Sequence, residues 1–216
     1  FLVTTKLAGI AYILAVVLGI VVGVVAAVNH GKWVDSALMT ISVFGISAPA
    51  FWIAIILQIV ICLKFNLLPL SGIDSFKSFI LPGIALGTRY AASIARITRT
   101  SMLDVLSQDY IRTAEAKGLK GWVVTIKHAL RNALIPIITI AGSDLGNILT
   151  GSVLVESVFS IPGIGKMLVD SINTRDLPIV QGGVMYIAVI CVIMYLVVDL
   201  LYTVVDPRIR LGKESS

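Results

Sequence analysis

The stretch that decides the fold is Leu7–Val28, LAGIAYILAVVLGIVVGVVAAV, which has 22 residues and no charged side chain. A helix needs about 20 mostly apolar residues to cross the hydrocarbon core of a bilayer. This stretch is apolar on every face, whereas a helix on the surface of a soluble domain keeps one polar face. The stretch therefore predicts a membrane-spanning helix.

Four further stretches of similar character follow along the chain. The five predicted spans are Leu7–Val28, Ala37–Leu63, Phe79–Ile97, Ala133–Val155 and Ile179–Val205. The third is the least apolar because it contains Arg89 and Arg96. Pro49 and Pro136 each remove a helix hydrogen bond, so we expect kinks at these positions. The sequence predicts an all-α integral membrane protein with one transmembrane domain, residues 1–216.

The composition excludes most other classes of protein. Hydrophobic residues make up 57% of the chain and charged residues 13%, against roughly 45–50% and 25% in an average soluble domain. The two histidines, His30 and His128, stand beside no Ser or Cys nucleophile motif. Cys62 and Cys191 lie in apolar runs, which suggests small buried side chains. We therefore expect no catalytic residue, no metal site and no cofactor bound by this chain.

The basic residues predict the orientation in the membrane. Of the 17 lysines and arginines, 11 lie in His30–Asp35, Arg96–Asn132 and Asp206–Ser216, which alternate spans place on one side. Cytoplasmic loops carry an excess of Lys and Arg. The visible chain is thus expected to begin outside and to end with a cytoplasmic carboxy terminus. The same excess explains the net charge of +5, so we expect a lipid bilayer and no nucleic acid as partner.

Small residues recur four positions apart in three of the predicted spans. The sets are Gly19, Gly23 and Ala27; Gly83 and Gly87; and Gly142 and Gly146. This spacing places small side chains on one helix face, where it lets two backbones approach closely. The ordinary glycine enrichment of membrane helices explains the sets equally well.

The longest connection, Thr98–Asn132, is expected to carry structure of its own. Asp109 is a predicted N-cap and Gly118 a predicted C′ residue, with a helix of about two turns at Tyr110–Lys117 between them. A solvated loop with incidental caps is the alternative. The predicted small apolar face of this helix consists of Ile111, Ala114 and Leu119.

This loop resembles that of a known family. The run YIRTAEAKGL (110–119), followed by HALRNALIP (128–136), is similar to the signature loop of binding-protein-dependent ABC importer permeases of the dipeptide/oligopeptide (peptide/nickel) branch. Three further segments resemble the same branch: ASIARITRTSMLDVL (92–106), LTGSVLVESVFSIPGIG (149–165) and VDLLYTVVDPRIRLG (198–212). With Gly118 on the family's motif glycine, Arg112 stands where the general motif has glutamate, so that acidic contact is not implied.

The resemblance implies a MetI-like type I ABC importer permease with six helices, five of them visible, and a first helix upstream of this chain. It implies that the cytoplasmic loop, residues 98–132, contains a coupling helix that docks on an ATPase. The implied docking residues are Tyr110, Ile111, Arg112, Ala114, Glu115, Ala116, Lys117, Gly118 and Leu119.

The resemblance also implies the partners and the place of work. They are a homologous second permease subunit, two cytosolic ATPase subunits and an extracytoplasmic substrate-binding protein, in a bacterial or archaeal inner membrane. This chain contains no phosphate-binding GxxxxGK[ST] sequence. ATP and magnesium are therefore expected on the partner subunits, and the permease is expected to be non-catalytic and to work by alternating access.

Three of the charges within the predicted spans are candidate functional residues: Arg89, Asp144 and Asp199. A charged side chain at the centre of a membrane helix costs about 2.5–3.5 kcal/mol on insertion scales and usually faces a cavity or a partner. Arg89 and Asp144 could line the substrate path and meet peptide termini or side chains. Alternatively, they could pair with each other and only hold helices together. For Asp199, near the end of the last span, a structural role is the better interpretation.

Two other transport functions stay open at this point. Related permeases carry nickel or metal chelates, although no His, Cys or Met cluster in the spans supports a metal site. An ion-coupled secondary transporter could use Asp144 and Asp199 as a relay. It would not need the long capped loop, and its uptake would survive ATP depletion.

Overall fold

The computed structural model describes residues 1–73 and 75–205, and every regular element within them is a helix. The predicted cytoplasmic terminus, Asp206–Ser216, lies outside the described residues. The elements are α1 (Leu2–Val28), α2 (Trp33–Ser47), α3 (Ala50–Leu57), η1 (Gln58–Lys64), η2 (Phe76–Phe79), α4 (Ile80–Leu106), α5 (Asp109–Ala116), α6 (Gly121–Val123), η3 (Val124–Leu130), α7 (Arg131–Val158), α8 (Ile164–Asn173) and α9 (Leu177–Val205).

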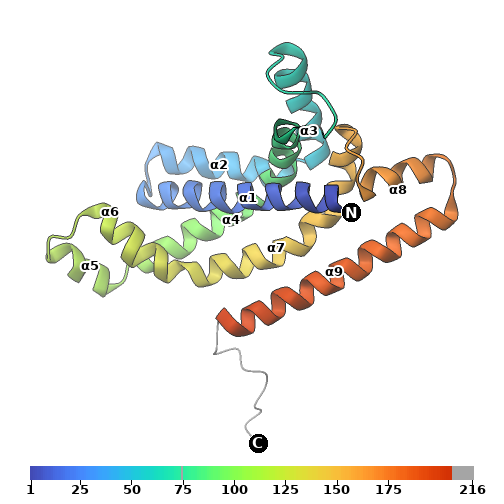
Figure 1. Ribbon diagram of the computed structural model, residues 1–216. Helices are drawn as coiled ribbons and strands as arrows, with labels where there is room; N and C mark the ends of the chain where they lie inside the picture. The colour runs from blue at the N-terminus through green and yellow to red at the C-terminus, as the bar shows by residue number, and fades with distance from the viewer. Residues whose placement is uncertain (74, 206–216) are drawn as a thin grey trace, which may run out of the picture.

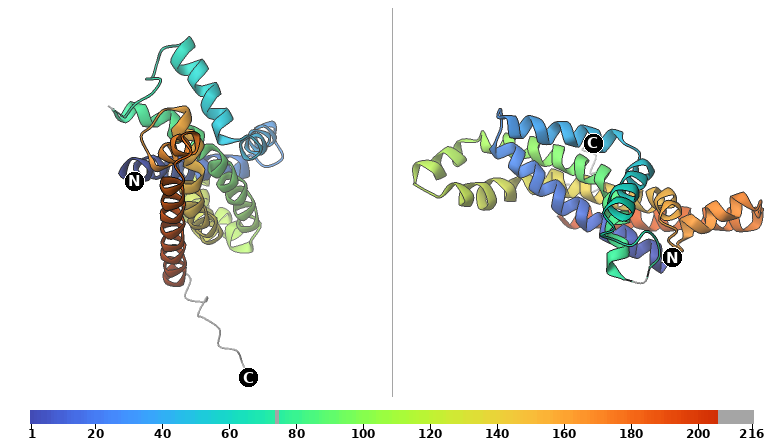
Figure 2. Two further views of the ribbon diagram at one scale, coloured as in Figure 1. Left: turned by 90° about the vertical axis from the view of Figure 1, so that its right-hand side faces the viewer. Right: turned by 90° about the horizontal axis from the view of Figure 1, so that it is seen from above.

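A bundle of α1, α2, α4 and α7 forms the body of the molecule, with these helices side by side along its length (Figures 1 and 2). Helix α4 is central, since it packs against α1, α2, α3 and α7. Helices α5 and α6 lie at one end of the bundle, together with the turn between α1 and α2; we call this the α5 end (Figure 1). The amino terminus and α8 lie at the opposite, α8 end.

Small residues let α1 and α4 approach closely. A Cβ added to Gly23 would lie 2.5 Å from the Cβ of Thr98, and one added to Gly87 would lie 2.7 Å from the carbonyl oxygen of Ala11. Gly19 lies equally close to α4. Of the two interpretations, close approach of two backbones is therefore the one that holds for Gly19, Gly23 and Gly87. The contacts advance in the same direction along both helices, so α1 and α4 run parallel.

Fewer helices than the predicted five are long enough and apolar enough to cross a bilayer on their own. Three such helices lie within Leu2–Val28, Gly121–Val158 and Leu177–Val198. A fourth span is present if α2 and the α3–η1 helix together form one broken span. Helix α4 is not among them because it carries several charged side chains. It nevertheless packs parallel to α1 from Ala11 to Gly23, so a bilayer that α1 crosses also surrounds α4.

The predicted single span Ala37–Leu63 is wrong as one helix, because the chain breaks there. Helix α2 ends at Ser47, Ala48 is extended, and the helix that starts at Ala50 is turned by 107°. A residue before proline avoids the helical conformation. Pro49 therefore does more than kink the helix: α3 packs against α4 and α7 but leaves the bundle at a steep angle to α2 (Figure 1).

Helix α8 begins at Ile164, within the Pro162–Gly165 segment, and lies outside the five predicted spans. The fully buried Glu156 lies in the last turn of α7, and its Oε2 accepts hydrogen bonds from the backbone N–H groups of Gly165 (2.8 Å) and Lys166 (3.3 Å). These are free donors at the start of α8. A negative charge is favourable beside a helix amino terminus, so Glu156 fixes α8 to the end of α7.

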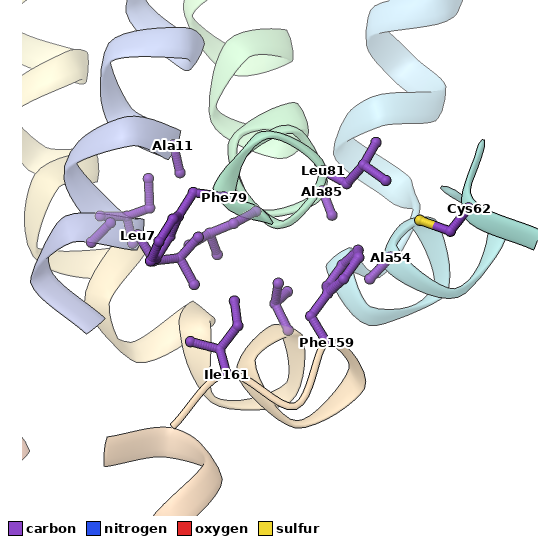
Figure 3. Close-up of a cluster of buried hydrophobic side chains, with 13 residues drawn as sticks. Leu7, Ala11, Ala54, Cys62, Phe79, Leu81, Ala85, Phe159 and Ile161 are labelled. Carbon is purple, nitrogen blue, oxygen red and sulfur yellow. The ribbon is translucent and has the colours of Figure 1, made fainter. Parts of the chain in front are cut away.

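Two apolar clusters fill the bundle, one near each end. The cluster near the α8 end is built from α1, α3, η1, η2, α4, α7 and the loop after α7 (Figure 3). Its labelled members are Leu7, Ala11, Ala54, Cys62, Phe79, Leu81, Ala85, Phe159 and Ile161. The expectation that Cys62 is buried is confirmed, while Cys191 is half-buried. The second cluster joins α1, α4, α5, η3 and α7.

Candidate functional site

Helix α5 begins directly after α4. The predicted cytoplasmic loop starts at Thr98, but α4 remains helical to Leu106, and only Ser107 and Gln108 separate the two helices. Asp109 is not the N-cap. Gln108 has the extended backbone of a cap (φ −77°, ψ 147°). Asp109 is the first residue of the helix, and its side chain is fully exposed. The reason is the short turn, which places the extended residue one position earlier than predicted.

The end of α5 agrees with the prediction. Gly118 has a φ of +76°, a left-handed conformation that favours glycine. The N–H of Gly118 donates to the carbonyl of Glu115 (2.9 Å), and the N–H of Leu119 donates to the carbonyl of Ala114 (3.4 Å). This pair of bonds is a Schellman motif with glycine at C′. The role of Gly118 as the residue that ends the helix is confirmed.

Some of the candidate docking residues lie on the buried face of α5 and the others lie on its exposed face. Ile111 and Ala114 are buried in the cluster shared with α4, η3 and α7, and they hold α5 to the rest of the subunit. Leu119 is 40% exposed and does not belong to that face. The residues available to a partner are Tyr110, Arg112, Glu115, Ala116, Lys117, Gly118 and Leu119.

A hydrogen bond joins α5 to the start of α7. The Nδ2 of Asn132 donates to the hydroxyl oxygen of Tyr110 (3.0 Å) and to the carbonyl of His128 (2.8 Å). Together with the buried Ile111, this bond holds α5 against the cluster that it shares with α4, η3 and α7. No local pattern in the sequence points to Asn132, because its partner Tyr110 lies 22 positions away.

An ion pair that sequence analysis missed ties α2 to α4 near the same end. The Nε of Arg99 donates to Oδ1 of Asp35 (2.6 Å), and an NH2 group of Arg99 donates to Oδ2 (2.7 Å). Asp35 is 4% exposed and also accepts from the N–H of Gly31 (3.2 Å). His30 Nδ1 lies 3.1 Å from Asp35 Oδ2. The two-bond geometry makes this a rigid link between helices.

Arg89 and Asp144 line one polar cleft of about 480 Å³ between α4 and α7. Neither forms a salt bridge within 4.0 Å to any residue that the structure describes. A direct ion pair that only holds the helices together is therefore not what the structure shows. The other residues of the lining are Ile46, Tyr90, Ser93, Asn147, Thr150 and Gly151.

The additional polar residues of this cleft could have been found from helical spacing. Ser93 lies four positions after Arg89, and Asn147 lies three positions after Asp144. Residues three or four apart share one helix face. Asn147 is also held from α9, because the hydroxyl of Tyr195 donates to its Oδ1 (2.8 Å). Nothing local in the sequence predicts that contact.

The fold has a polar cleft within an apolar bundle and a partly exposed short helix, α5, at one end of that bundle, and both features agree with the comparison to known proteins. The model of the family "binding-protein-dependent transport system inner membrane component" matches residues 19–211. The chain belongs to this family. It is 44% identical over 210 residues to the glutathione transport system permease protein GsiC of Escherichia coli (strain K12), covering 97% of this chain and 69% of the relative.

A second relative has similar identity. The dipeptide transport system permease protein DppB of Bacillus subtilis (strain 168) is 45% identical over 215 residues, covering 100% of this chain and 70% of the relative. The membrane permease assignment and the all-helical MetI-like fold expected from the resemblance are thus confirmed.

Solved structures of low identity share the fold. An inward-facing structure of the MetNI methionine ABC transporter has a TM-score of 0.75 at 16% identity, covering 94% of this chain and 93% of the other. An amino acid ABC transporter structure has a TM-score of 0.69 at 16% identity, covering 94% and 90%. The arrangement of helices in Figure 1 is therefore that of ABC transporter permeases.

Proposed function

We propose that this ABC importer permease carries dipeptides or related short peptides through the cleft between α4 and α7. The observation that carries the proposal is that one helix, α4, both lines the polar cleft and leads directly into α5. The guanidinium of Arg89 suits a peptide carboxylate, and the carboxylate of Asp144 suits a peptide ammonium. Relatives named for dipeptide and glutathione transport support the same class of cargo.

Coupling to ATP is assigned to α5. In the proposal, two cytosolic ATPase subunits hold ATP and magnesium, and one of them receives the exposed face of α5. Closure of the ATPases moves α5 together with α4 and α7, because Ile111 and Ala114 are buried against these helices. A second permease subunit completes the path, and an extracytoplasmic binding protein delivers the peptide. This chain contributes no catalytic residue of its own.

Peptide is favoured over nickel or a metal chelate by the chemistry of the cleft. Its lining offers one guanidinium, one carboxylate, an amide and hydroxyl groups. Metal ligation would call for several imidazole, thiolate or carboxylate groups at one point. Arg89 and Asp144 carry opposite charges and form no salt bridge with each other, so they match a zwitterionic peptide with one charge at each terminus.

The test is uptake by the complete transporter in proteoliposomes. With ATP inside and binding protein outside, radiolabelled dialanine is expected to accumulate, and the ATPase subunits are expected to co-purify with this chain. Accumulation driven by an ion gradient without ATP would contradict the proposal and favour a secondary transporter. Uptake of nickel but not of dialanine would contradict the peptide assignment alone.

A further inference from the structure

Helix α4 carries a line of polar side chains that continues beyond Arg89. Its members are Arg89, Ser93, Arg96 and Thr100, at steps of four, three and four residues. On a helix of 3.6 residues per turn these positions share one face. At 1.5 Å per residue, Arg96 lies about 10 Å along the axis from Arg89. Arg96 is the second arginine of the predicted span Phe79–Ile97, close to its cytoplasmic end.

A second cleft follows this line. It has a volume of about 250 Å³ and shares Ile46 and Ser93 with the cleft of Arg89 and Asp144. Its other lining residues are Arg96, Ile97, Thr100 and Ile140. Because the two clefts share residues on α2 and α4, they are neighbours along one route. The route leads from Asp144 towards the α5 end of the bundle.

The three arginines of α4 differ in what they contact. Arg99 is held by Asp35 at 2.6 Å and belongs to the scaffold. Arg89 and Arg96 are exposed and form no salt bridge with any described residue. Each lines a cleft instead. Asp144 is the single acidic residue in the described lining of the two clefts, so the stretch from Ser93 to Thr100 carries positive charge alone.

We propose that Arg96 is a second substrate-contacting residue, which receives the carboxylate of the cargo from Arg89 as the peptide moves towards the cytoplasm. The inference rests on the proposed function and adds a residue and a direction to it. A guanidinium binds a carboxylate through two parallel hydrogen bonds. Two such groups in series let the cargo leave the first, since conduction needs sites that bind without trapping.

The charge of the second cleft can be measured without a binding protein. Thr100→Cys, in the assembled transporter with Cys62→Ala and Cys191→Ala, is treated with anionic (sulfonatoethyl) and cationic (trimethylammonioethyl) methanethiosulfonates. After each rate is divided by that for free cysteine, we expect the anionic reagent to react at least fivefold faster. Adding Arg96→Gln is expected to abolish this preference.

The control for that measurement is Lys32→Gln, which removes the same charge from the exposed turn between α1 and α2. It is expected to leave the preference intact. Equal normalised rates in the parent, or a preference that survives Arg96→Gln, would overturn the proposal. Ser93→Cys reports on the same route if the Thr100→Cys protein does not assemble.

Transport gives the second readout. With saturating binding protein, Arg96→Gln is expected to lower the maximal rate of dialanine uptake at least fivefold. The KM for the binding protein and its stimulation of ATP hydrolysis are expected to stay unchanged, and Arg96→Lys is expected to restore most of the rate. Unchanged uptake in Arg96→Gln, or no rescue by lysine, would overturn the relay. Failure of the unsubstituted transporter to take up dialanine would instead overturn the proposed function.

Discussion

At the scale of single residues, contacts decide what each charge of α4 does. Arg99 forms two hydrogen bonds with the buried Asp35 and joins two helices. Arg89 and Arg96 line clefts and remain available to cargo. The three side chains are chemically identical and lie on one helix, so their roles follow from the neighbours that the fold brings to each.

The Asp35–Arg99 ion pair predicts a loss of stability when it is broken. Asp35→Ala is expected to lower the free energy of unfolding by about 3 kcal/mol, because it leaves a half-buried guanidinium without its partner. For a chain of this size that corresponds to a melting temperature lower by about 6 °C or more in detergent. Thermal unfolding of the purified permease measures it.

The matched control is Asp170→Ala, which breaks the more exposed pair with Lys166 on one turn of α8. Exposed pairs of this kind contribute about 0.3–0.5 kcal/mol, so the melting temperature is expected to stay nearly the same. An equal fall in melting temperature in both variants would show that the Asp35–Arg99 pair stabilises the protein no more than an exposed pair does.

Gly118 predicts a defect in coupling. Gly118→Val is expected to strain the left-handed turn after α5 by about 1–2 kcal/mol, although an added Cβ meets nothing within 4 Å. The expected result is weaker co-purification of the ATPases or ATP hydrolysis that is uncoupled from uptake. Gly121→Val is the control, since Gly121 has neither a positive φ nor a close neighbour. Normal assembly and transport in Gly118→Val would contradict the assignment of α5 as the coupling helix that Gly118 ends.

At the scale of elements, the parallel pair of α1 and α4 is the central contact of the bundle. Small residues bring the two backbones together without large side chains between them. In lipid there is little hydrophobic force between helices, so close packing itself supplies the attraction. This contact explains how a helix with several charges is kept inside an apolar bundle.

The same contact predicts that Gly23→Ala destabilises the bundle. The new Cβ would lie 2.6 Å from the carbonyl oxygen of Ala95, so backbone must move. Overpacking of this kind costs about 1–3 kcal/mol, which thermal unfolding in detergent detects. Gly9→Ala is the control on the same helix, because its Cβ meets nothing within 4 Å. A Gly23→Ala protein as stable as Gly9→Ala would contradict the close contact.

At the scale of the whole molecule, the two ends of the bundle carry different structural elements. The α5 end presents the exposed face of α5 beside the Asp35–Arg99 link. The α8 end holds α8, which Glu156 fixes by its first backbone N–H groups. The route of two clefts runs between α4 and α7 towards the α5 end. A transporter driven from one side needs this polarity.

The polarity predicts opposite accessibility of the two ends in cells. In a background with Cys62→Ala and Cys191→Ala, a membrane-impermeant maleimide is expected to label Asn173→Cys in intact spheroplasts. Lys117→Cys is expected to react only after permeabilisation, because positive-inside charge places α5 in the cytoplasm. Both positions are exposed. The reverse pattern would invert the proposed orientation.

Local patterns predicted much of the fold. Apolar runs located α1, α7 and α9 to within a few residues, and Gly118 was identified as the end of α5 because its turn depends on neighbours in the chain. Asp109 was wrong as N-cap, and Ala37–Leu63 was wrong as one span. Cap position and the 107° turn at Pro49 depend on how the adjoining helices are packed.

The sequence by itself determined that the chain is a helical membrane permease and which charges stand inside its apolar stretches, because hydropathy and motifs are local properties. Only the tertiary structure decided what those charges do. It showed that Arg99 meets Asp35 across 64 positions, that Arg89 and Asp144 share a cleft without an ion pair, and that Arg96 continues the route. Contacts between distant segments arise from packing, and no local pattern encodes them.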